Sequence, residues 1–489
     1  MNEHSVPKAA PEDGIAHIER RFWSMREASR AEPPPTAGER KAWLRALRGA
    51  IGENVGEFSE AIAGDFGWRS HDETRMAEIL PSLTLIRDAL VNLNRWMRPE
   101  ARATQIQFWP ARNRVYWQPK GVVLIIAPWN YPLQLTVGAL AAALAAGNRV
   151  IVKPSETTPA TAAALKRILE GALGPDRVAV ATGGPDAAAA LCALPFDHIL
   201  FTGSTAVGKR VMQAAAQNLT PVTLELGGKS PAIMHGDCDH AVAADRIARG
   251  KLLNAGQTCI APDYALVQKS RAGEFVQLFQ EAVARFYPRI IDNADYTSIV
   301  NQRHYDRLVD LAADARSKGA RLVTVDPARE LPAGEIGVRN VRKIAPVVAT
   351  DVTDGMAMMR EEIFGPILPV VTYETLDEAI AYVNARPRPL ALYYFDGDRT
   401  RAEAVLQRTV SGGVSVNDTL LHFAQEGLPF GGIGPSGMGA YHGRDGFRTF
   451  SHGKGVFLQS RWTLTGLVAP PYGPRFRRVI GFATWRSGG

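Results

Sequence analysis

Apolar residues recur at helical spacing through the first hundred residues of the chain. Trp43, Leu44, Leu47 and Ile51 fall on one face of a helix, and residues 83–93 repeat the spacing. The pattern predicts an amphipathic helical opening.

A run of three prolines, Pro33 to Pro35, interrupts this opening, and Thr36 follows as a candidate cap for the next helix. We expect the residues before the prolines to form a loosely attached tail.

The pattern changes at residue 104, where residues 105–108 and 114–118 alternate between polar and apolar. Residues 110–113 are suited to a turn, so a two-stranded ribbon is predicted. Because an isolated ribbon is marginal in water, this one should pack on another surface, such as a second subunit.

Next, apolar runs alternate four times with helical patterns. The pairs are 121–127 with 137–146, 149–153 with 159–169, 178–181 with 186–193, and 198–202 with 206–217. Repeated strand–helix units predict a parallel, doubly wound sheet, which binds ligands at the carboxyl ends of its strands.

A second α/β stretch covers residues 230–450. Its predicted helices are 239–253, 272–286 and 305–318, and residues 367–373 are strand-like. We expect a separate domain.

The chain of 489 residues is 46% hydrophobic, which suffices for two or three cored domains. Its net charge of +7 is thinly spread. Nucleic acid or a membrane surface is therefore a weak alternative, and an anionic dinucleotide suits the charge equally well.

The three cysteines, Cys192, Cys238 and Cys259, are too few for a disulfide framework, and no paired spacing indicates zinc or another metal. Residues 1–14 lack the apolar core of a secretory signal. The longest apolar stretches, 121–128 and 137–147, fall short of the ~18 to 20 residues that span a bilayer. A soluble cytoplasmic protein is expected.

Cys259 follows small residues in Asn254-Ala255-Gly256-Gln257-Thr258. A thiol there could face a cleft and be activated, although a lone cysteine is more often a small buried apolar residue. Glu225 lies between leucines before two glycines, where desolvation would raise its pKa toward that of a general base; the alternative is a surface carboxylate before a turn.

Asn130 lies in Ala127-Pro128-Trp129-Asn130-Tyr131-Pro132, directly after a predicted strand. Its amide could donate to an oxyanion, but asparagine beside proline is also ordinary in turns.

Residues 201–208, Phe-Thr-Gly-Ser-Thr-Ala-Val-Gly, lead a strand into a helix whose amino end could hold a pyrophosphate. The segment is not GxGxxG. It nearly matches a P-loop, but Arg210 replaces the serine or threonine that would meet magnesium. In Lys153-Pro154-Ser155-Glu156, the end residues could bind ribose hydroxyls, or the segment could be only a capped turn.

These segments in this order, together with EEIFGP and PFGGIGPSGMGAYHG, resemble the aldehyde dehydrogenase superfamily over almost the whole chain. Details such as residues 261–264 and 439–443 are similar to its class 3 branch. Residues 194–198 and 386–390 are similar to bacterial members that act on coniferyl aldehyde.

The resemblance implies an aldehyde dehydrogenase-like α/β fold. It has a doubly wound nucleotide-binding domain (1–103 and 120–227), an α/β catalytic domain (228–455) and a small β bridging region (104–119 and 456–489) that forms a homodimer. The apolar segment 479–485 is suited to docking on a partner but is too short to cross a membrane.

The resemblance also implies oxidation of an aldehyde to its acid through a thioester, with Cys259 as nucleophile, Glu225 as general base and Asn130 as oxyanion donor. NAD is the expected cofactor, because the Glu156 carboxylate should repel a 2′-phosphate, although Lys153 beside it could tolerate NADP. The expected cofactor-binding residues are Ile126, Ala127, Pro128, Trp129, Lys153, Ser155, Glu156, Gly203, Ser204, Val207, Leu226, Glu362 and Phe364.

Several alternatives stay open at this point. The substrate is expected to be an aromatic aldehyde, with Trp129, Tyr131, Tyr264 and Phe423 at the entrance, but these residues could equally pack the core, and a fatty aldehyde would then fit as well. A CoA-acylating dehydrogenase is disfavoured by Glu225. A cysteine hydrolase would need His235, His422 or His442 beside Cys259 as its base. A non-enzymatic binding role would not explain why every residue expected for catalysis is present.

Overall fold

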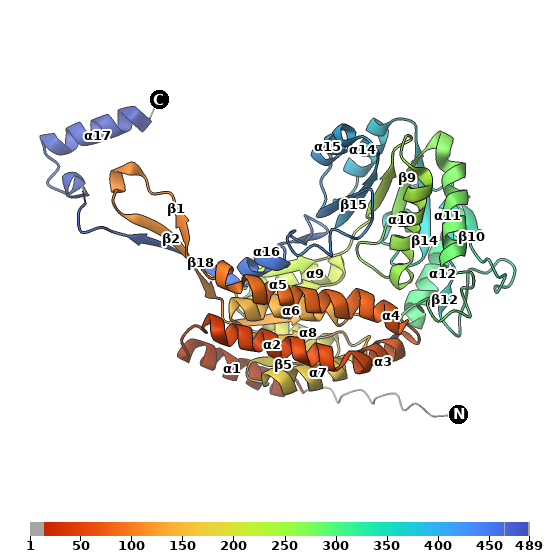
Figure 1. Ribbon diagram of the computed structural model, residues 1–489, viewed down its shortest axis with the longest axis horizontal. Helices are drawn as coiled ribbons and strands as arrows, with labels where there is room; N and C mark the ends of the chain where they lie inside the picture. The colour runs from red at the N-terminus through yellow and green to blue at the C-terminus, as the bar shows by residue number, and fades with distance from the viewer. Residues whose placement is uncertain (1–13, 464, 488–489) are drawn as a thin grey trace.

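The structure, a computed structural model, describes residues 14–463 and 465–487. It contains two α/β bodies and a β arm that projects from them (Figure 1). The first body holds a six-stranded sheet in the order β17-β7-β6-β3-β4-β5, parallel except for β17. Its strands are β3 (Val122–Ile126), β4 (Arg149–Lys153), β5 (Val178–Val180), β6 (His198–Thr202), β7 (Val222–Glu225) and β17 (Gly437–Met438).

Helices cover both faces of this sheet, because successive side chains of a strand point to opposite sides. Val123 and Ile125 of β3 belong to one apolar core, and Val122 and Leu124 belong to another. The first face carries α2 (Ala37–Glu53), α3 (Val55–Phe66), α5 (Leu80–Trp96), α6 (Gln134–Ala146) and α7 (Pro159–Leu173); the second carries α1 (Ile15–Ala31), α8 (Pro185–Ala193) and α9 (Thr205–Ala216). The predicted doubly wound sheet is confirmed.

The start of the chain differs in part from its prediction. Thr36 caps α2 in a capping box with Glu39, as expected of a cap. The segment before the prolines is not a loose tail, because α1 buries Ile18, Phe22 and Met25 against the sheet. Those apolar residues recur at helical spacing, which the tail prediction overlooked. Residues 1–13, also assigned to that tail, lie outside the described residues.

The second body holds a seven-stranded sheet in the order β10-β13-β14-β9-β8-β15-β16, parallel except for β10. Its strands are β8 (Pro231–Met234), β9 (Tyr264–Gln268), β10 (Arg321–Thr324), β13 (Val347–Thr350), β14 (Ile367–Tyr373), β15 (Ala391–Phe395) and β16 (Gly413–Val416). Its helices are α10 (His240–Leu252), α11 (Ala272–Phe286), α12 (Gln302–Ser317), α13 (Ala357–Arg360), α14 (Leu376–Asn384) and α15 (Arg399–Arg408). The expected second α/β unit is therefore present.

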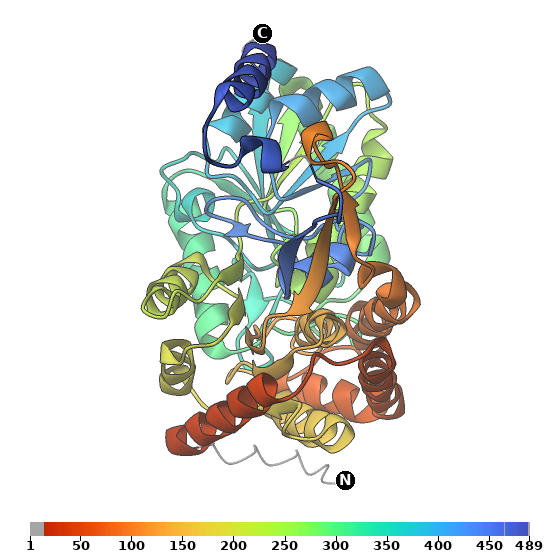
Figure 2. The same cartoon turned by 90° about the vertical axis from the view of Figure 1, so that its left-hand side faces the viewer.

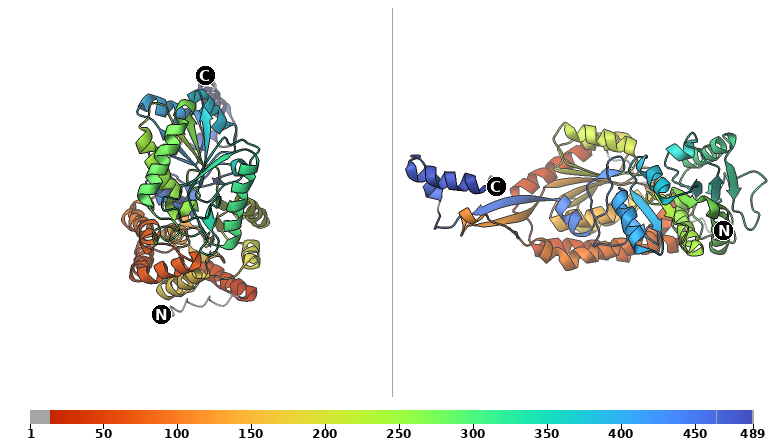
Figure 3. Two further views of the ribbon diagram at one scale, coloured as in Figure 1. Left: turned by 90° about the vertical axis from the view of Figure 1, so that its right-hand side faces the viewer. Right: turned by 90° about the horizontal axis from the view of Figure 1, so that it is seen from above.

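The arm is a three-stranded antiparallel sheet of β1 (Glu100–Arg102), β2 (Arg112–Pro119) and β18 (Ser451–Leu458). Residues 106–108, expected in a strand, form a 3₁₀ turn. The reason is the pairing of Arg102 with Asn113, which makes the residues between them the connection. Beyond β18 the chain ends in α17 (Pro474–Ser487), which Figure 2 and Figure 3 show at the tip of the arm.

The boundary predicted between residues 455 and 456 falls inside β18. Just before it, β17 pairs with β7, and α16 (Gly443–Thr449) contacts α5 and α6. This stretch therefore packs on the first body, although it follows the second in sequence. No helix within residues 14–463 and 465–487 has the length and apolar character needed to cross a bilayer.

Candidate active site

The carboxyl ends of the parallel strands gather most of the residues singled out from the sequence. β3 pairs with β4 on one side and with β6 on the other, so the connections that leave β3 and β6 diverge at this edge. Such a switch point is where open α/β sheets bind ligands. The predicted residues at this edge are Ile126, Ala127, Pro128 and Trp129 after β3, Lys153, Ser155 and Glu156 after β4, Gly203, Ser204 and Val207 after β6, and Glu225 and Leu226 after β7.

The amino end of α9 is open at this edge. Ser204 caps the helix by accepting a hydrogen bond from the backbone N–H of Val207, whose side chain is exposed. The Thr202 Oγ1 atom is buried without a hydrogen-bond partner among the described residues. A helix amino end with free N–H groups is suited to an anion.

After β4, Lys153 donates to Glu156 over 2.8 Å and to the Pro154 carbonyl over 3.1 Å. The Glu156 side chain remains about half exposed, at 48%. Hydrogen bonding to Lys153 lowers the Glu156 pKa despite partial burial, so the group stays a carboxylate. A fixed carboxylate beside an exposed edge is suited to hydroxyl groups.

The Cys259 loop leaves α10 through two residues with left-handed backbone, Asn254 at φ 55° and Ala255 at φ 50°. Gln257 holds the loop in this shape. It donates to the Ser298 carbonyl over 3.0 Å and accepts from the Val300 N–H over 2.9 Å. Its buried amide thus ties the loop to a neighbouring segment.

The structure brings Asn130 to this loop. The Asn130 Nδ2 atom donates to the Gln257 carbonyl over 3.2 Å, two residues before the cysteine. The adjoining Tyr131 hydroxyl lies 2.7 Å from Thr258 Oγ1, next to Cys259. Two segments separated by more than a hundred residues therefore meet at Cys259.

Glu225 ends β7 in a buried position, and neither carboxyl oxygen has a hydrogen-bond partner among the described residues. Burial raises its pKa well above the ordinary value, which favours the protonated acid. A buried acid without a partner costs stability. Acids of this kind, with strongly perturbed pKa values, are common at functional sites.

Cys259 lies near this acid and is half-buried. Burial raises the pKa of its thiol to about 12, and repulsion from Glu362 and Glu225 adds to the shift, while the N–H groups of Cys259 and Ile260 oppose it. The resting sulfur is a thiol, so a base must remove its proton before it can attack.

Glu362 and Phe364 arrive from the second body. The Glu362 side chain lies against Gly227, where a Cβ atom would collide with its carboxylate. Burial, and next Asp263, raise the Glu362 pKa to about 8. Phe364 contacts Trp129 edge-on, with ring centroids 5.3 Å apart, so residues after β3 and after α13 border one space.

Of the residues expected at the entrance, Tyr264 lies elsewhere. It is 1% exposed and packs edge-on against Tyr382 inside the second core, because it is the first residue of the central strand β9. Phe423 is half-buried and packs against Phe430 and His442.

Sequence reasoning missed three groups near the site. Lys251 is buried in the last turn of α10, and its amine has no hydrogen-bond partner among the described residues. Burial lowers its pKa to about 8. Lys229 pairs with Asp263 and donates to the Met358 and Glu361 carbonyls. For Lys251 the sequence offers one weak signal, a lysine on the apolar face of a predicted helix.

The third missed group is an ion-pair cluster around Arg69, beside Asn130. Nothing in its local sequence pattern distinguishes it from a solvated helix end.

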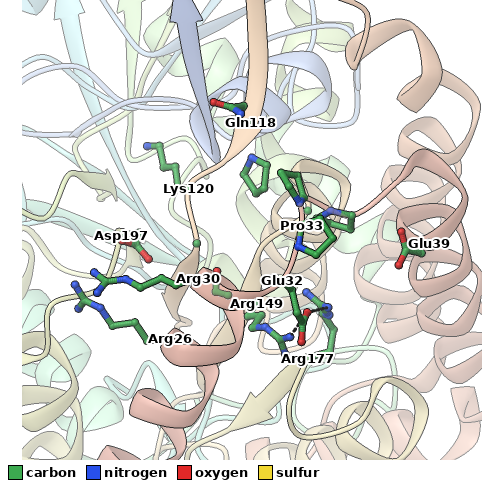
Figure 4. A pocket seen from close by; sticks show the side chains of 16 residues that line it. Arg26, Arg30, Glu32, Pro33, Glu39, Gln118, Lys120, Arg149, Arg177 and Asp197 are labelled. Atoms are coloured by element: carbon green, nitrogen blue, oxygen red, sulfur yellow. Dashed lines mark hydrogen bonds and ion pairs between the residues drawn. The ribbon is translucent and has the colours of Figure 1, made fainter.

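A cavity of about 440 Å³ lies at the opposite edge of the first sheet (Figure 4). It is lined by Arg26, Arg30, Lys120, Arg149 and Arg177 among others, at the amino ends of β3, β4 and β5. None of the predicted site residues lines it.

The comparisons with known proteins identify the family. Residues 5–456 match the model of the aldehyde dehydrogenase family, and the chain belongs to that family. It is an NAD(P)⁺-dependent aldehyde dehydrogenase, so the predicted family, fold and cofactor class are confirmed.

Two relatives and one solved structure are informative. A Pseudomonas aeruginosa protein named "Probable coniferyl aldehyde dehydrogenase" is 51% identical, with 95% of this chain and 96% of that one covered. Mouse "Aldehyde dehydrogenase family 3 member A2" is 44% identical, with 90% and 88% covered. The Mycobacterium tuberculosis aldehyde dehydrogenase complexed with NAD⁺ has a TM-score of 0.83 at 30% identity, with 93% and 92% covered.

Proposed function

We propose that the protein oxidises an aromatic aldehyde of the coniferyl aldehyde type, with Cys259 as nucleophile, Asn130 as oxyanion donor and Glu225 as general base. The convergence of these three residues carries the proposal: Asn130 is bonded to the Cys259 loop, and the partnerless Glu225 carboxyl is close enough to influence the thiol. The name of the 51% identical relative supports the substrate class.

The first step joins the Cys259 sulfur to the aldehyde carbon while the thiol proton passes to a base, which Glu225 can be once ionised. The carbonyl oxygen becomes an oxyanion. The Asn130 amide has two N–H groups and uses one on the Gln257 carbonyl, so the second is available to the oxyanion beside the Cys259 N–H.

The residues at the carboxyl edge fit a nicotinamide dinucleotide. The open amino end of α9 and Gly203 suit the pyrophosphate, Lys153 and Glu156 suit the adenosine ribose, and Glu362 and Phe364 suit the nicotinamide end. When bound, the oxidised cofactor accepts the hydride that the adduct loses.

The acyl group then remains on Cys259 as a thioester. Glu225 first releases the thiol proton to solvent and then takes a proton from water. The resulting hydroxide attacks the thioester carbon, the carboxylic acid leaves, and the departing Cys259 thiolate regains a proton from Glu225. Since burial raises the Glu225 pKa and so favours the protonated acid, hydrolysis should speed up as pH rises and the carboxylate forms.

The histidines do not support a cysteine hydrolase. His422 lies 3.0 Å from Ser415 Oγ, and burial lowers its pKa to about 4 and that of His442 to about 3. Among the described residues no histidine is hydrogen-bonded to Cys259.

Assembly as a homodimer in the cytoplasm completes the proposal. The arm exposes Ile106, Trp109 and Trp462, at 80%, 64% and 77%, and such apolar area is suited to covering by a second subunit. Free cysteines suit a reducing compartment. Light scattering of the purified chain would give the number of subunits.

A panel of aldehydes tests the substrate class. Coniferyl, cinnamyl, benzoic and long-chain aliphatic aldehydes are supplied with NAD⁺, and absorbance of the reduced cofactor is followed. We expect the highest kcat/KM for coniferyl or cinnamyl aldehyde. A preference of tenfold or more for the aliphatic aldehyde would reject the aromatic assignment.

Adding coenzyme A tests the acyl acceptor. We expect the free acid as product with or without it, and formation of the acyl-CoA would reject Glu225 as the base for water.

A further inference from the structure

Arg69 lies in the turn after α3 and is completely buried, with its guanidinium between two carboxylates. Its Nη1 atom lies 2.7 Å from Glu78, which is equally buried, and its Nε atom lies 3.2 Å from Glu73. Burying three charges is expensive, and replacement of such clusters by apolar residues is often stabilising. Stability alone therefore does not explain why this cluster is buried here.

One side of the cluster holds the segment that carries Asn130. Arg69 donates to the Asn130 carbonyl over 3.3 Å, and its guanidinium lies over the Tyr131 ring at 4.9 Å. Glu78 accepts the N–H groups of Leu133 and Gln134 over 2.8 and 3.0 Å, at the start of α6. Arg69 and Glu78 thus contact both the backbone and a side chain of residues 130–134.

The other side holds the loop that carries Cys259. Glu73 accepts a hydrogen bond from the Asn254 backbone N–H, and the Thr297 hydroxyl donates to it over 3.1 Å. Asn254 in turn donates through its amide to the Asn130 carbonyl over 3.0 Å. Asn254 has left-handed backbone, which a flexible loop would not keep without such contacts.

We propose that Arg69, with Glu73 and Glu78, is a positioning residue that fixes the Asn130 amide relative to the Cys259 sulfur. The inference rests on the roles proposed for Asn130 and Cys259. Neither Arg69 nor its two carboxylates touches reacting atoms; each acts through the backbone of the two loops. A shift of about 1 Å in such a pair costs on the order of 100-fold in rate.

The cluster should affect formation and collapse of the covalent adduct more than cofactor binding. Its contacts reach residues 130–134 and 254, whereas the proposed adenosine and pyrophosphate contacts follow β4 and β6. Loss of the cluster should therefore lower kcat and leave KM for NAD⁺ unchanged.

The test compares Arg69→Met with Arg149→Met. Arg149 is a matched control because it is 5% exposed and is paired with Glu32 at 2.5 Å, but lies at the opposite edge of the sheet. Each variant is measured for Tm, kcat, KM for NAD⁺, and the effect of deuterium on the aldehyde C–H. Arg69→Met should lower kcat at least tenfold with KM for NAD⁺ within twofold, and the isotope effect should rise. Arg149→Met should lower Tm while kcat and the isotope effect stay near wild type.

Since Arg69→Met alone leaves two buried carboxylates, the variant R69M/E73Q/E78Q keeps the shapes and removes the charges together. It should fold and still lose kcat. The proposal is overturned if this folded variant keeps kcat within twofold of wild type, or if both arginine variants lose kcat in proportion to their loss of Tm.

The rate at which iodoacetamide alkylates Cys259 separates this result from failure of the proposed function. If Asn130→Ala keeps full activity, the proposed oxyanion role fails, whereas an altered alkylation rate in R69M/E73Q/E78Q still shows that the cluster positions the cysteine loop. An unchanged rate would overturn the positioning role itself.

Discussion

The two edges of the first sheet differ in how their polar groups are satisfied. At the amino edge a cavity is lined by cations, but Glu32 pairs with Arg149 and approaches Arg177, and Lys120 lies 2.9 Å from His198 (Figure 4). At the carboxyl edge Glu225 is buried without a hydrogen-bond partner in the part of the chain that the structure describes, and Cys259 has a raised pKa. Among the described residues the Arg26 Nε atom at the cavity also lacks a partner, so the candidate chemistry is marked by the unmet acid near a thiol and not by the cavity.

This difference follows from the cost of desolvation. A buried group without a partner costs stability, so an acid of this kind at the carboxyl edge of the sheet is a candidate for contact with a ligand or a reacting group. At the amino edge the buried Arg149 guanidinium has a partner in the half-exposed Glu32 carboxylate, which lowers this cost. Variants at the carboxyl edge should accordingly lower kcat, whereas variants at the amino edge should lower Tm.

The largest expected effect is at Cys259. Cys259→Ala should lower dehydrogenase activity by about 10⁴-fold or more, because no other group forms the covalent adduct. Cys192→Ala is the control, since that thiol is buried in the core among α1, α8 and α9. Steady-state rates of cofactor reduction measure both variants. A comparable loss of activity in Cys192→Ala would contradict a special role for Cys259.

Glu225→Gln should lower kcat by about 100-fold, the lower range for loss of a general base. In the wild type, kcat should rise with pH as the buried acid ionises, because only the carboxylate accepts a proton. The variant should lose this rise. A pH profile of both proteins shows it, and an unchanged profile would assign the base elsewhere.

Glu156→Gln should change cofactor choice by about tenfold, measured as the ratio of kcat/KM for NADP⁺ to that for NAD⁺. Removing the carboxylate removes repulsion of a 2′-phosphate and frees Lys153 from its ion pair. Glu53→Gln, at the exposed end of α2, is the control with the same change in charge. A strong NADP⁺ preference in the wild type would contradict the expected order.

Glu32→Gln at the amino edge should leave kcat within twofold and lower Tm by about 2 °C, since its pair with Arg149 is partly exposed. Thermal denaturation and steady-state kinetics measure the two quantities. A loss of kcat without loss of Tm would link the amino edge to catalysis.

The smallest effect is on stability at Glu225. Its folded pKa is raised, so the folded state holds a proton that the unfolded chain releases, and stability falls as pH rises above the ordinary glutamate value. Glu225→Gln removes this loss. Its Tm should exceed that of wild type by more at pH 8 than at pH 5, and a constant difference would mean that Glu225 is not buried as a neutral acid.

Strands and helices of the first sheet were predictable because each has a strong local period. Residues 149–153 and 198–202 were placed as strands with the observed bounds. The tip of the arm was less predictable, since alternation at residues 105–108 does not show that both edges of β2 are already paired, one with β1 and the other with β18.

The chain itself determined which chemistry is available: a cysteine after a helix, a glutamate before two glycines and an asparagine after a strand. Only the tertiary structure decided that they meet. In it Asn130 is hydrogen-bonded to the loop of Cys259, Glu225 has no hydrogen-bond partner within residues 14–463 and 465–487, and Tyr264 is buried away from the entrance. The physical reason is that burial and long-range pairing set pKa values and orientation, and neither is encoded in local sequence period.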